Sequence, residues 1–137
     1  GLGTVKAEHC DVFGRMHAPW FIGRISDSVP SLLYDWRQKV SGLTGDKVPG
    51  GAVLEYFLVY RRWPKPGDLF QVHSSYAGAT DKVHSLVHWV MDPDSGKAWL
   101  TCKVIAVTFD LETRKIIAPP PEHMHELEQL APKGLAV

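Results

Sequence analysis

Hydrophobic residues in the first third of the chain recur at helical spacing. Between residues 19 and 40 they are separated by four, four, three and four positions, which places them on one face of a helix. Pro19 suits the first helical turn, where no backbone N–H is needed. Pro30 lies inside the pattern, and because an interior proline removes a hydrogen bond we expect a kinked helix or two collinear pieces. The apolar face consists of Phe21, Ile25, Val29, Leu32 and Trp36.

The hydrophobic period changes to two after a glycine-rich loop at residues 41–51. Alternation of apolar and polar positions predicts four strands, and turn-forming residues (PKPGD and DPDSGK) mark two of the connections between them. Weaker alternation at residues 4–9 predicts one more short strand before the helix. The four strands are expected at residues 51–63, 69–78, 82–91 and 98–109.

The predicted order is a strand, a long helix, four strands and a short C-terminal helix in the segment HMHELEQL. This order indicates an α+β domain in which one long central helix packs on a curved antiparallel sheet of about five strands. We expect residues 1–137 to form a single domain. Since one helix covers only one side of such a sheet, we also expect self-association.

The composition narrows the classes of function. Fifteen basic residues balance fifteen acidic ones, so the chain lacks the basic footprint of a general nucleic-acid-binding protein. No apolar run is long enough for a membrane span. Two cysteines, Cys10 and Cys102, fit a reducing compartment, and we expect a cytoplasmic protein. His84 and His88 lie four apart on a predicted strand without a third ligand at metal-like spacing, so we expect no metal site.

Ionisable residues cluster at the junction between the first predicted strand and the helix, in the segment CDVFGRMHAPW at residues 10–20. The N-terminus of a helix presents unpaired N–H groups and a positive dipole end, which can stabilise an oxyanion. Asp11 lies just upstream, where a carboxylate can act as a nucleophile or as a base on water. The ordinary alternative for Asp11 is a turn or capping aspartate. Gly14 permits a sharp turn.

At this point the chain resembles the hotdog-fold acyl-CoA thioesterases, and in particular their 4-hydroxybenzoyl-CoA thioesterase-like branch. Asp11, Gly14 and the start of a long helix match the family frame in spacing. The Gly-Asp pair at residues 67–68 and the closing segment FDLETRKIIAPPPE at residues 109–122 also match its pattern. The resemblance therefore covers nearly the whole chain and implies a hotdog fold.

What the resemblance implies for function is hydrolysis of an acyl-CoA or acyl-carrier-protein thioester. Asp11 would be the catalytic carboxylate, and the backbone N–H groups of His17 and Ala18 would polarise the thioester carbonyl. Independently of the resemblance, Gly14 lets the chain approach a ligand closely, and Arg15 is a candidate contact for an anionic substrate or carrier, with a solvated arginine as the ordinary alternative. Coenzyme A would enter as part of the substrate, with no separate cofactor, and the active site would lie at the interface of a homodimer or homotetramer.

Basic residues outside this segment are candidates for holding the phosphates of the acyl carrier. Arg61 and Arg62 form a compact basic pair, for which the alternative is a charged strand end that discourages edge pairing. Lys82 is what this chain retains of the basic cluster that some relatives place before the fourth strand. Position 17 is His, where relatives often carry Asn or an aromatic residue.

Two other functions remain open from the sequence. One is a hotdog hydratase or dehydratase of acyl thioesters, although the hydration motif of such enzymes is not evident in the chain. The other is a non-catalytic protein that binds acyl thioesters. Some relatives fuse two hotdog units, so the chain is either a complete single domain or one half of a tandem protein.

Overall fold

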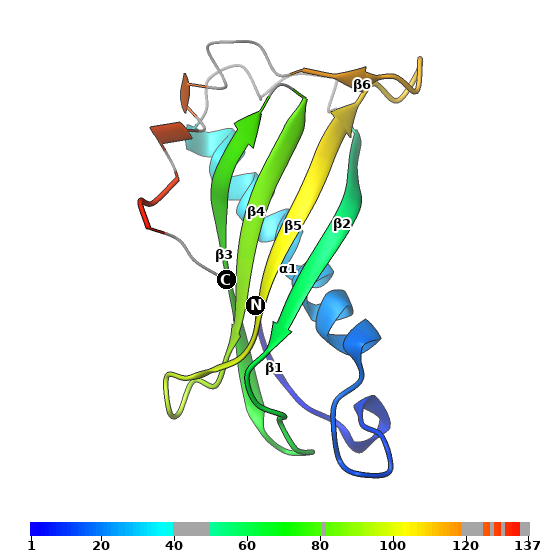
Figure 1. Ribbon diagram of the computed structural model, residues 1–137, viewed down its shortest axis with the longest axis vertical. Helices are drawn as coiled ribbons and strands as arrows, with labels where there is room; N and C mark the ends of the chain where they lie inside the picture. Colours follow the sequence, from blue (N-terminus) through cyan, green and yellow to red (C-terminus); the bar gives the residue numbers. More distant parts are fainter. Residues whose placement is uncertain (40–49, 81, 119–124, 127, 130, 135–137) are drawn as a thin grey trace.

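The computed structural model describes residues 1–39, 50–80, 82–118, 125–126, 128–129 and 131–134, with backbone alone for residues 33 and 35–39. One long helix lies across a curved antiparallel sheet (Figure 1). The strand order in the sheet is β1-β3-β4-β5-β2, and β6 pairs with β5 beyond this path. The α+β architecture predicted from the periodicity is confirmed.

Helix α1 (Ala18–Lys39) is continuous and contains Pro30 in its interior. Its apolar face is the predicted one, because Phe21 and Ile25 are fully buried and Leu32 packs against the core. Ser28 joins this face with only 6% of its surface exposed. The Trp36 side chain, expected on the same face, lies outside the described residues.

Four long strands build the sheet and agree with the predicted positions. Each neighbouring pair is antiparallel, and both β3–β4 and β4–β5 pair along almost their whole length. The first of the long strands ends at Tyr60, three residues before the predicted end. The bounds are β2 (Gly50–Tyr60), β3 (Leu69–Thr80), β4 (Val83–Met91) and β5 (Ala98–Phe109).

The prediction of a strand at residues 4–9 was wrong. Strand β1 (Leu2–Thr4) pairs with β3, and the chain then forms a short 3-10 helix, η1 (Ala7–His9). The backbone N–H of Lys6 donates a hydrogen bond to Nδ1 of His9 at 3.1 Å, which closes this turn. The local side-chain bond replaces the sheet pairing that the weak alternation had indicated.

The described residues of the C-terminal part include a strand that the sequence did not predict. Strand β6 (Ile116–Ile117) pairs with Thr108 and Phe109 at the end of β5. Residues 125–126 and 128–129 are helical, as the prediction of a short C-terminal helix requires. The proline-rich segment expected before this helix lies mainly outside the described residues.

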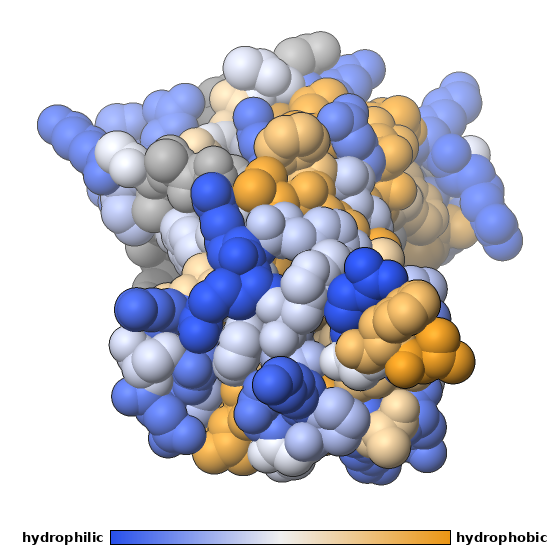
Figure 2. Space-filling model, turned by 60° about the horizontal axis from the view of Figure 1, so that its bottom comes forward, coloured by the Kyte–Doolittle hydropathy of each residue, from blue (hydrophilic) through white to orange (hydrophobic). Residues whose placement is uncertain are grey.

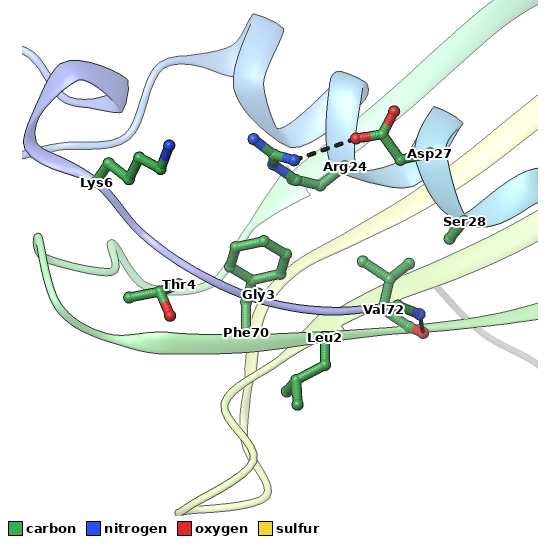
Figure 3. A pocket seen from close by; sticks show the side chains of 10 residues that line it. Leu2, Gly3, Thr4, Lys6, Arg24, Asp27, Ser28, Phe70 and Val72 are labelled. Atoms are coloured by element: carbon green, nitrogen blue, oxygen red, sulfur yellow. Dashed lines mark hydrogen bonds and ion pairs between the residues drawn. The ribbon is translucent and has the colours of Figure 1, made fainter.

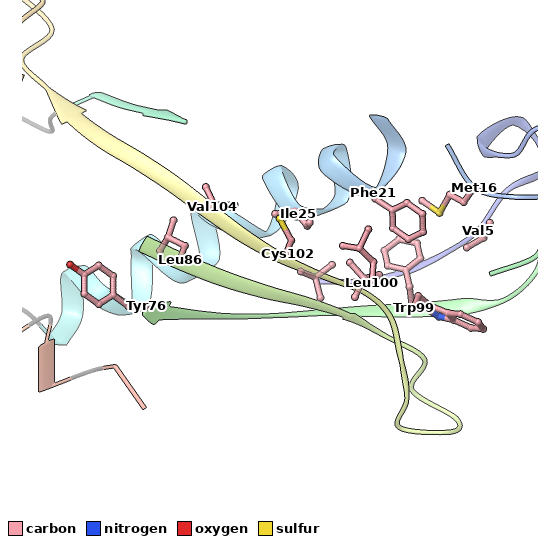
Figure 4. Packing of buried hydrophobic residues seen from close by; sticks show 13 residues of the cluster. Val5, Met16, Phe21, Ile25, Tyr76, Leu86, Trp99, Leu100, Cys102 and Val104 are labelled. Carbon is pink, nitrogen blue, oxygen red and sulfur yellow. The ribbon is translucent and has the colours of Figure 1, made fainter. Parts of the chain in front are cut away.

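The hydrophobic core fills the space between α1 and the concave face of the sheet (Figure 4). Phe21 and Ile25 from the helix face Leu100, Cys102 and other buried side chains of the strands. Burial of such side chains is the main stabilising contribution to folding. Because this core fixes the first turns of α1 against the sheet, it also fixes the loop that precedes the helix.

Candidate active site

The loop before α1, residues 10–16, is a tight turn closed at its base and is called the Asp11 loop below. Cys10 and Met16 form an isolated antiparallel bridge, so the chain leaves and returns at the same place. Inside the loop the N–H of Asp11 donates to the carbonyl oxygen of Arg15 at 2.8 Å, and the N–H of Gly14 donates to that of Asp11 at 2.9 Å. Gly14 has a φ of 75°, a backbone conformation that side chains disfavour. The loop therefore presents Asp11 in a fixed position next to the helix.

The Asp11 carboxylate accepts three hydrogen bonds from its own loop. Oδ1 accepts the backbone N–H groups of Phe13 and Arg15, both at 2.9 Å, and Oδ2 accepts Nε of Arg15 at 3.1 Å. These bonds, of which that from the Arg15 N–H has the largest effect, lower the pKa of Asp11 below its usual value. The side chain of Asp11 is 24% exposed, so the ionised carboxylate remains open to a ligand.

Fewer backbone N–H groups are free to bind a substrate at the start of α1 than the sequence predicted. The N–H of His17 donates to the carbonyl oxygen of His9 at 2.9 Å, and Pro19 has no N–H to offer. The expectation that the His17 amide polarises a substrate carbonyl is therefore not supported by this geometry. The N–H of Ala18 makes no hydrogen bond within residues 1–39, which leaves it as a donor at the helix start. The His17 side chain is exposed.

Aromatic rings flank the guanidinium of Arg15. Its Cζ atom lies 5.1 Å from the ring centre of Phe13 and 6.0 Å from that of Trp63, distances typical of cation–π contacts. The Trp63 ring in turn stacks on the ring of Tyr60, the last residue of β2, with 4.6 Å between the ring centres. Arg15 is therefore packed against the end of β2. The loop tip is apolar, with Val12 and Phe13 exposed by 95% and 78%. Figure 2 brings this end of the molecule forward and shows apolar side chains protruding beside charged ones.

The basic residues expected to bind the carrier are not brought together. Lys82 precedes Val83, which is opposite Val107, whereas Arg61 follows the end of β2 near Leu100. Leu100 and Val107 are seven residues apart on β5, a separation of about 24 Å, so Lys82 lies at the other end of the strands. Within one chain Lys82 and the pair Arg61–Arg62 cannot hold the same phosphate group.

Arg62 already has several partners. Its guanidinium lies 4.2 Å from the ring centre of Trp99 and forms an ion pair with Asp92 at 3.5 Å. Nη2 also donates to the carbonyl oxygen of Lys97 at 3.1 Å. Arg61 is more exposed, with one long contact from Nη2 to Oγ1 of Thr101 at 3.5 Å. Of the two arginines, Arg61 is therefore the one free to meet a ligand.

His9 could tune the ionisation of Asp11 if both shared one strand face, but the structure places it in η1, buried, with a structural role. His9 is buried, its carbonyl oxygen accepts the His17 N–H, and its ring lies 4.2 Å from that of Trp20. These contacts fix the start of α1 relative to the Asp11 loop. Burial is the main cause that lowers the pKa of His9 below its usual value. A buried histidine next to a helix start has no signature that spacing alone reveals.

Histidines elsewhere lie apart from this site. Nδ1 of His88 is 2.7 Å from Oγ of Ser74, and His84 contacts Tyr76 and Thr108. Across the part of the chain that the structure describes, no three His, Cys, Asp or Glu side chains are grouped closely enough to hold a metal ion. In the same residues, no helix combines the length and apolar character that crossing a bilayer requires.

Solved structures with the same fold include several proteins described as thioesterases. The chain superposes on YbaW, a probable thioesterase from Escherichia coli, with a TM-score of 0.77 and 19% identity over 96% of this chain and 98% of that one. The Staphylococcus aureus protein SAV2348, solved in complex with CoA, superposes with a TM-score of 0.78 and 20% identity over 100% of this chain and 87% of that one. An acyl-ACP thioesterase from Bacteroides thetaiotaomicron superposes with a TM-score of 0.80 and 14% identity, and the whole of this chain covers 54% of that one.

These likenesses establish the hotdog fold, in which one long helix packs on a curled antiparallel sheet. A comparison with curated protein sequences finds no match. The model of the thioesterase-like superfamily matches residues 5–127, which include the Asp11 loop, α1 and all four long strands. The chain therefore belongs to the thioesterase-like superfamily.

Proposed function

We propose that this protein hydrolyses an acyl thioester carried by coenzyme A or by an acyl carrier protein. The observation that carries the proposal is the Asp11 carboxylate, ionised and accessible, in a rigid loop immediately before the N-terminus of α1. Membership of the thioesterase-like superfamily supports the same reaction class. The CoA complex and the acyl-ACP thioesterase among the similar structures support the two candidate carriers.

In this proposal Asp11 acts on the thioester carbonyl. Its lowered pKa keeps the carboxylate ionised at neutral pH, which both direct attack on the carbonyl and activation of water require. Attack by a carboxylate oxygen forms a mixed anhydride and expels the thiolate, which takes a proton from water. Water then hydrolyses the anhydride and restores Asp11. The Ala18 N–H would hold the carbonyl oxygen as it becomes negative.

The remaining residues of the loop have supporting roles. Gly14 gives the turn its shape, and Arg15 holds the Asp11 carboxylate through its Nε. Arg61 is the candidate for contact with the carrier, since Arg62 is engaged with Trp99 and Asp92. Coenzyme A would be part of the substrate, and the reaction as written needs no separate cofactor.

A homodimer would complete the site. Strand β2 forms one edge of the sheet, and its Val53, Leu54 and Phe57 side chains are exposed by 43%, 61% and 56%. An edge strand with exposed apolar residues is a natural pairing surface for a second copy of the chain. The 4-hydroxybenzoyl-CoA thioesterase-like branch and a cytoplasmic location remain proposals that rest on the sequence.

Two features of the site favour a second candidate function, binding of acyl thioesters without hydrolysis. The Asp11 carboxylate is closed on one side by Arg15, and the N–H of His17 is bonded to His9. Both features reduce the groups available for catalysis relative to an open site. In this case acyl-CoA would bind to the protein and remain intact.

Thiol release from a panel of short, medium, long and aromatic acyl-CoAs, and from acyl-ACP, tests the proposal. We expect turnover with at least one acyl class, and the preferred acyl group will define the substrate. Binding of acyl-CoA without thiol release would instead support the second candidate. Addition of water to enoyl-CoA, followed in parallel, would identify a hydratase and contradict both.

A further inference from the structure

A cavity lies between α1 and β1. Its volume is about 370 Å³, within the range of sites for small ligands. Gly3 and Thr4 of β1 form one wall, Arg24 and Ser28 of α1 form the other, and Phe70 of β3 forms part of the floor (Figure 3). Nothing in the Asp11 site makes use of this groove.

Two cationic side chains meet over the groove. Figure 3 shows the Lys6 amine and the Arg24 guanidinium pointing into the same space from opposite walls, above the ring of Phe70. Asp27 is the acidic residue of the lining and forms an ion pair with Nη1 of Arg24 at 3.2 Å. The groove therefore carries an excess of positive charge over its own acidic residue.

Arg24 is not satisfied by this ion pair. Its Nε is buried and has no hydrogen-bond acceptor among the residues that the structure describes. Because Asp27 takes Nη1, the edge formed by Nε and Nη2 is left, and this edge is the one that binds two oxygens of a carboxylate or phosphate. The Arg24 side chain lines the groove and is 31% exposed, so its guanidinium is within reach of a ligand there.

The acidic neighbours of the two cations are easily exchanged. The Asp27 side chain is 70% exposed, and Lys6 pairs with Glu8 at 3.6 Å with both side chains about two-thirds exposed. Ion pairs at such exposure contribute little to stability. An anionic ligand that contacts Lys6 and Arg24 together therefore displaces only weak interactions.

The end of the groove away from Lys6 also holds the N-terminal amino group of Gly1, which donates to the carbonyl oxygen of Val72 at 3.1 Å. Val72 lies there, together with Ser28, whose hydroxyl donates to the carbonyl oxygen of Ile25 at 2.7 Å (Figure 3). A short chain that extends from the anionic group can reach the Val72 side chain at this end.

We propose that this groove is a binding site for a small anionic oxygen group, a carboxylate or a phosphate, held between Arg24 and Lys6. Arg24 follows Ala18 by six residues, so it lies about 9 Å along the helix from the proposed oxyanion site. If the proposed thioesterase function holds, the anion is either a carboxylate at the far end of the acyl chain or a phosphate of the carrier. The anion site itself does not depend on that function.

Binding of simple anions tests the site without any assay of activity. The probes are hexanoate, its neutral isostere hexanamide and inorganic phosphate, added at constant ionic strength while the Nε–H signal of Arg24 is followed by NMR. We expect saturable shifts with hexanoate and phosphate and none with hexanamide. An Arg24 signal that does not respond to either anion, or that responds equally to hexanamide, would overturn the proposal.

Three variants sharpen the test. Arg24→Gln should abolish binding, followed through the signals of Val72. Asp27→Asn removes the competing acid and should tighten binding by about threefold to tenfold. Lys103→Gln changes the net charge equally on an exposed position of β5 and should leave binding unchanged. Equal weakening by Arg24→Gln and Lys103→Gln would show a general charge effect and contradict a defined site.

Thioester probes then identify the source of the anion. If the groove holds an acyl carboxylate, adipoyl-CoA will bind about tenfold more tightly than hexanoyl-CoA, and Arg24→Gln will remove the difference. If it holds a carrier phosphate, CoA will shift the Arg24 signal more than dephospho-CoA. These are binding measurements, so absence of thioester hydrolysis would count against the proposed function and leave the groove assignment intact.

Discussion

Nε of Arg15 lies 3.1 Å from Oδ2 of Asp11, and the backbone N–H of the same arginine lies 2.9 Å from Oδ1. One residue thus holds both oxygens of the carboxylate on which the proposed reaction depends. Phe13 and Trp63 hold the guanidinium in turn. Because Arg15 acts on Asp11 and not on the substrate carbonyl, it is a positioning residue.

Replacement of Arg15 tests this role. Arg15→Gln removes the charge and the Nε bond, so the pKa of Asp11 will rise towards its usual value. Activity that needs the ionised carboxylate falls as the pH drops through that pKa, so the acid limb of the kcat/KM profile will move to higher pH. We also expect kcat/KM at neutral pH to fall by roughly tenfold to a hundredfold, because the carboxylate is less well oriented.

Arg15→Lys is the matched control, since it restores the charge but not the planar guanidinium. It should recover part of the shift in the pH profile and less of the rate. An unchanged acid limb in Arg15→Gln would show that Arg15 does not set the ionisation of Asp11.

Replacement of Arg61 and replacement of Arg62 should affect the free energy of unfolding differently. Arg62 joins the end of β2 to the β4–β5 turn through Trp99, Asp92 and Lys97. Arg62→Gln should therefore lower the free energy of unfolding by about 1–2 kcal/mol. Arg61→Gln should leave stability nearly unchanged and raise KM for an acyl-CoA.

Urea unfolding of both variants, together with steady-state kinetics, separates the two roles. A stable Arg62→Gln variant with a raised KM would mean that Arg62, and not Arg61, meets the carrier.

A buried histidine gives the fold a pH dependence. Burial lowers the pKa of His88 to about 4, while in the unfolded chain it returns to about 6.5. Between these values the unfolded state binds more protons, so stability falls as the pH drops from 7 towards 4. For His88 alone the loss between pH 7 and pH 5 is about 2 kcal/mol.

Urea unfolding at pH 7 and pH 5 measures this loss. His88→Asn keeps a polar side chain beside Ser74 but does not titrate, so the difference between the two pH values should shrink by that amount. The same comparison in His84→Asn gives the contribution of a half-buried histidine whose pKa burial also lowers. An identical pH dependence in wild type and His88→Asn would contradict the assignment.

The exposed edge of β2 predicts a dimer. Light scattering should give twice the mass of the chain, and Phe57→Lys should shift the protein to monomer because it places a charge on the edge. Lys103→Gln, on the neighbouring strand, serves as the control. A monomeric wild type would contradict the proposed dimer edge.

Much of the fold was predictable because its elements are long and periodic. The spacing of Phe21, Ile25 and Leu32 defines the buried face of α1, and alternation defines the four long strands. The short elements were not predictable. In η1 a single side-chain bond from Lys6 to His9 decides the conformation, and β6 depends on pairing with the distant end of β5.

The candidate site was predictable only in part. The position of Asp11 before the helix follows from the order of the elements, but its closure by Arg15 depends on the turn geometry that Gly14 allows. The loss of the His17 amide to His9 requires η1, which the sequence did not indicate. The separation of Lys82 from Arg61 follows from the pairing register of the strands, which the residue types alone do not predict.

The most direct test of the account is thiol release by wild type and by Asp11→Asn, with the best acyl thioester of the panel. Asn keeps an oxygen that can accept the Phe13 and Arg15 N–H groups, so the loop should persist and the fold remain intact. We predict that turnover falls by at least about a hundredfold while acyl-CoA binding and the unfolding midpoint stay close to wild type. Undiminished turnover in a folded Asp11→Asn variant would contradict the central role of Asp11.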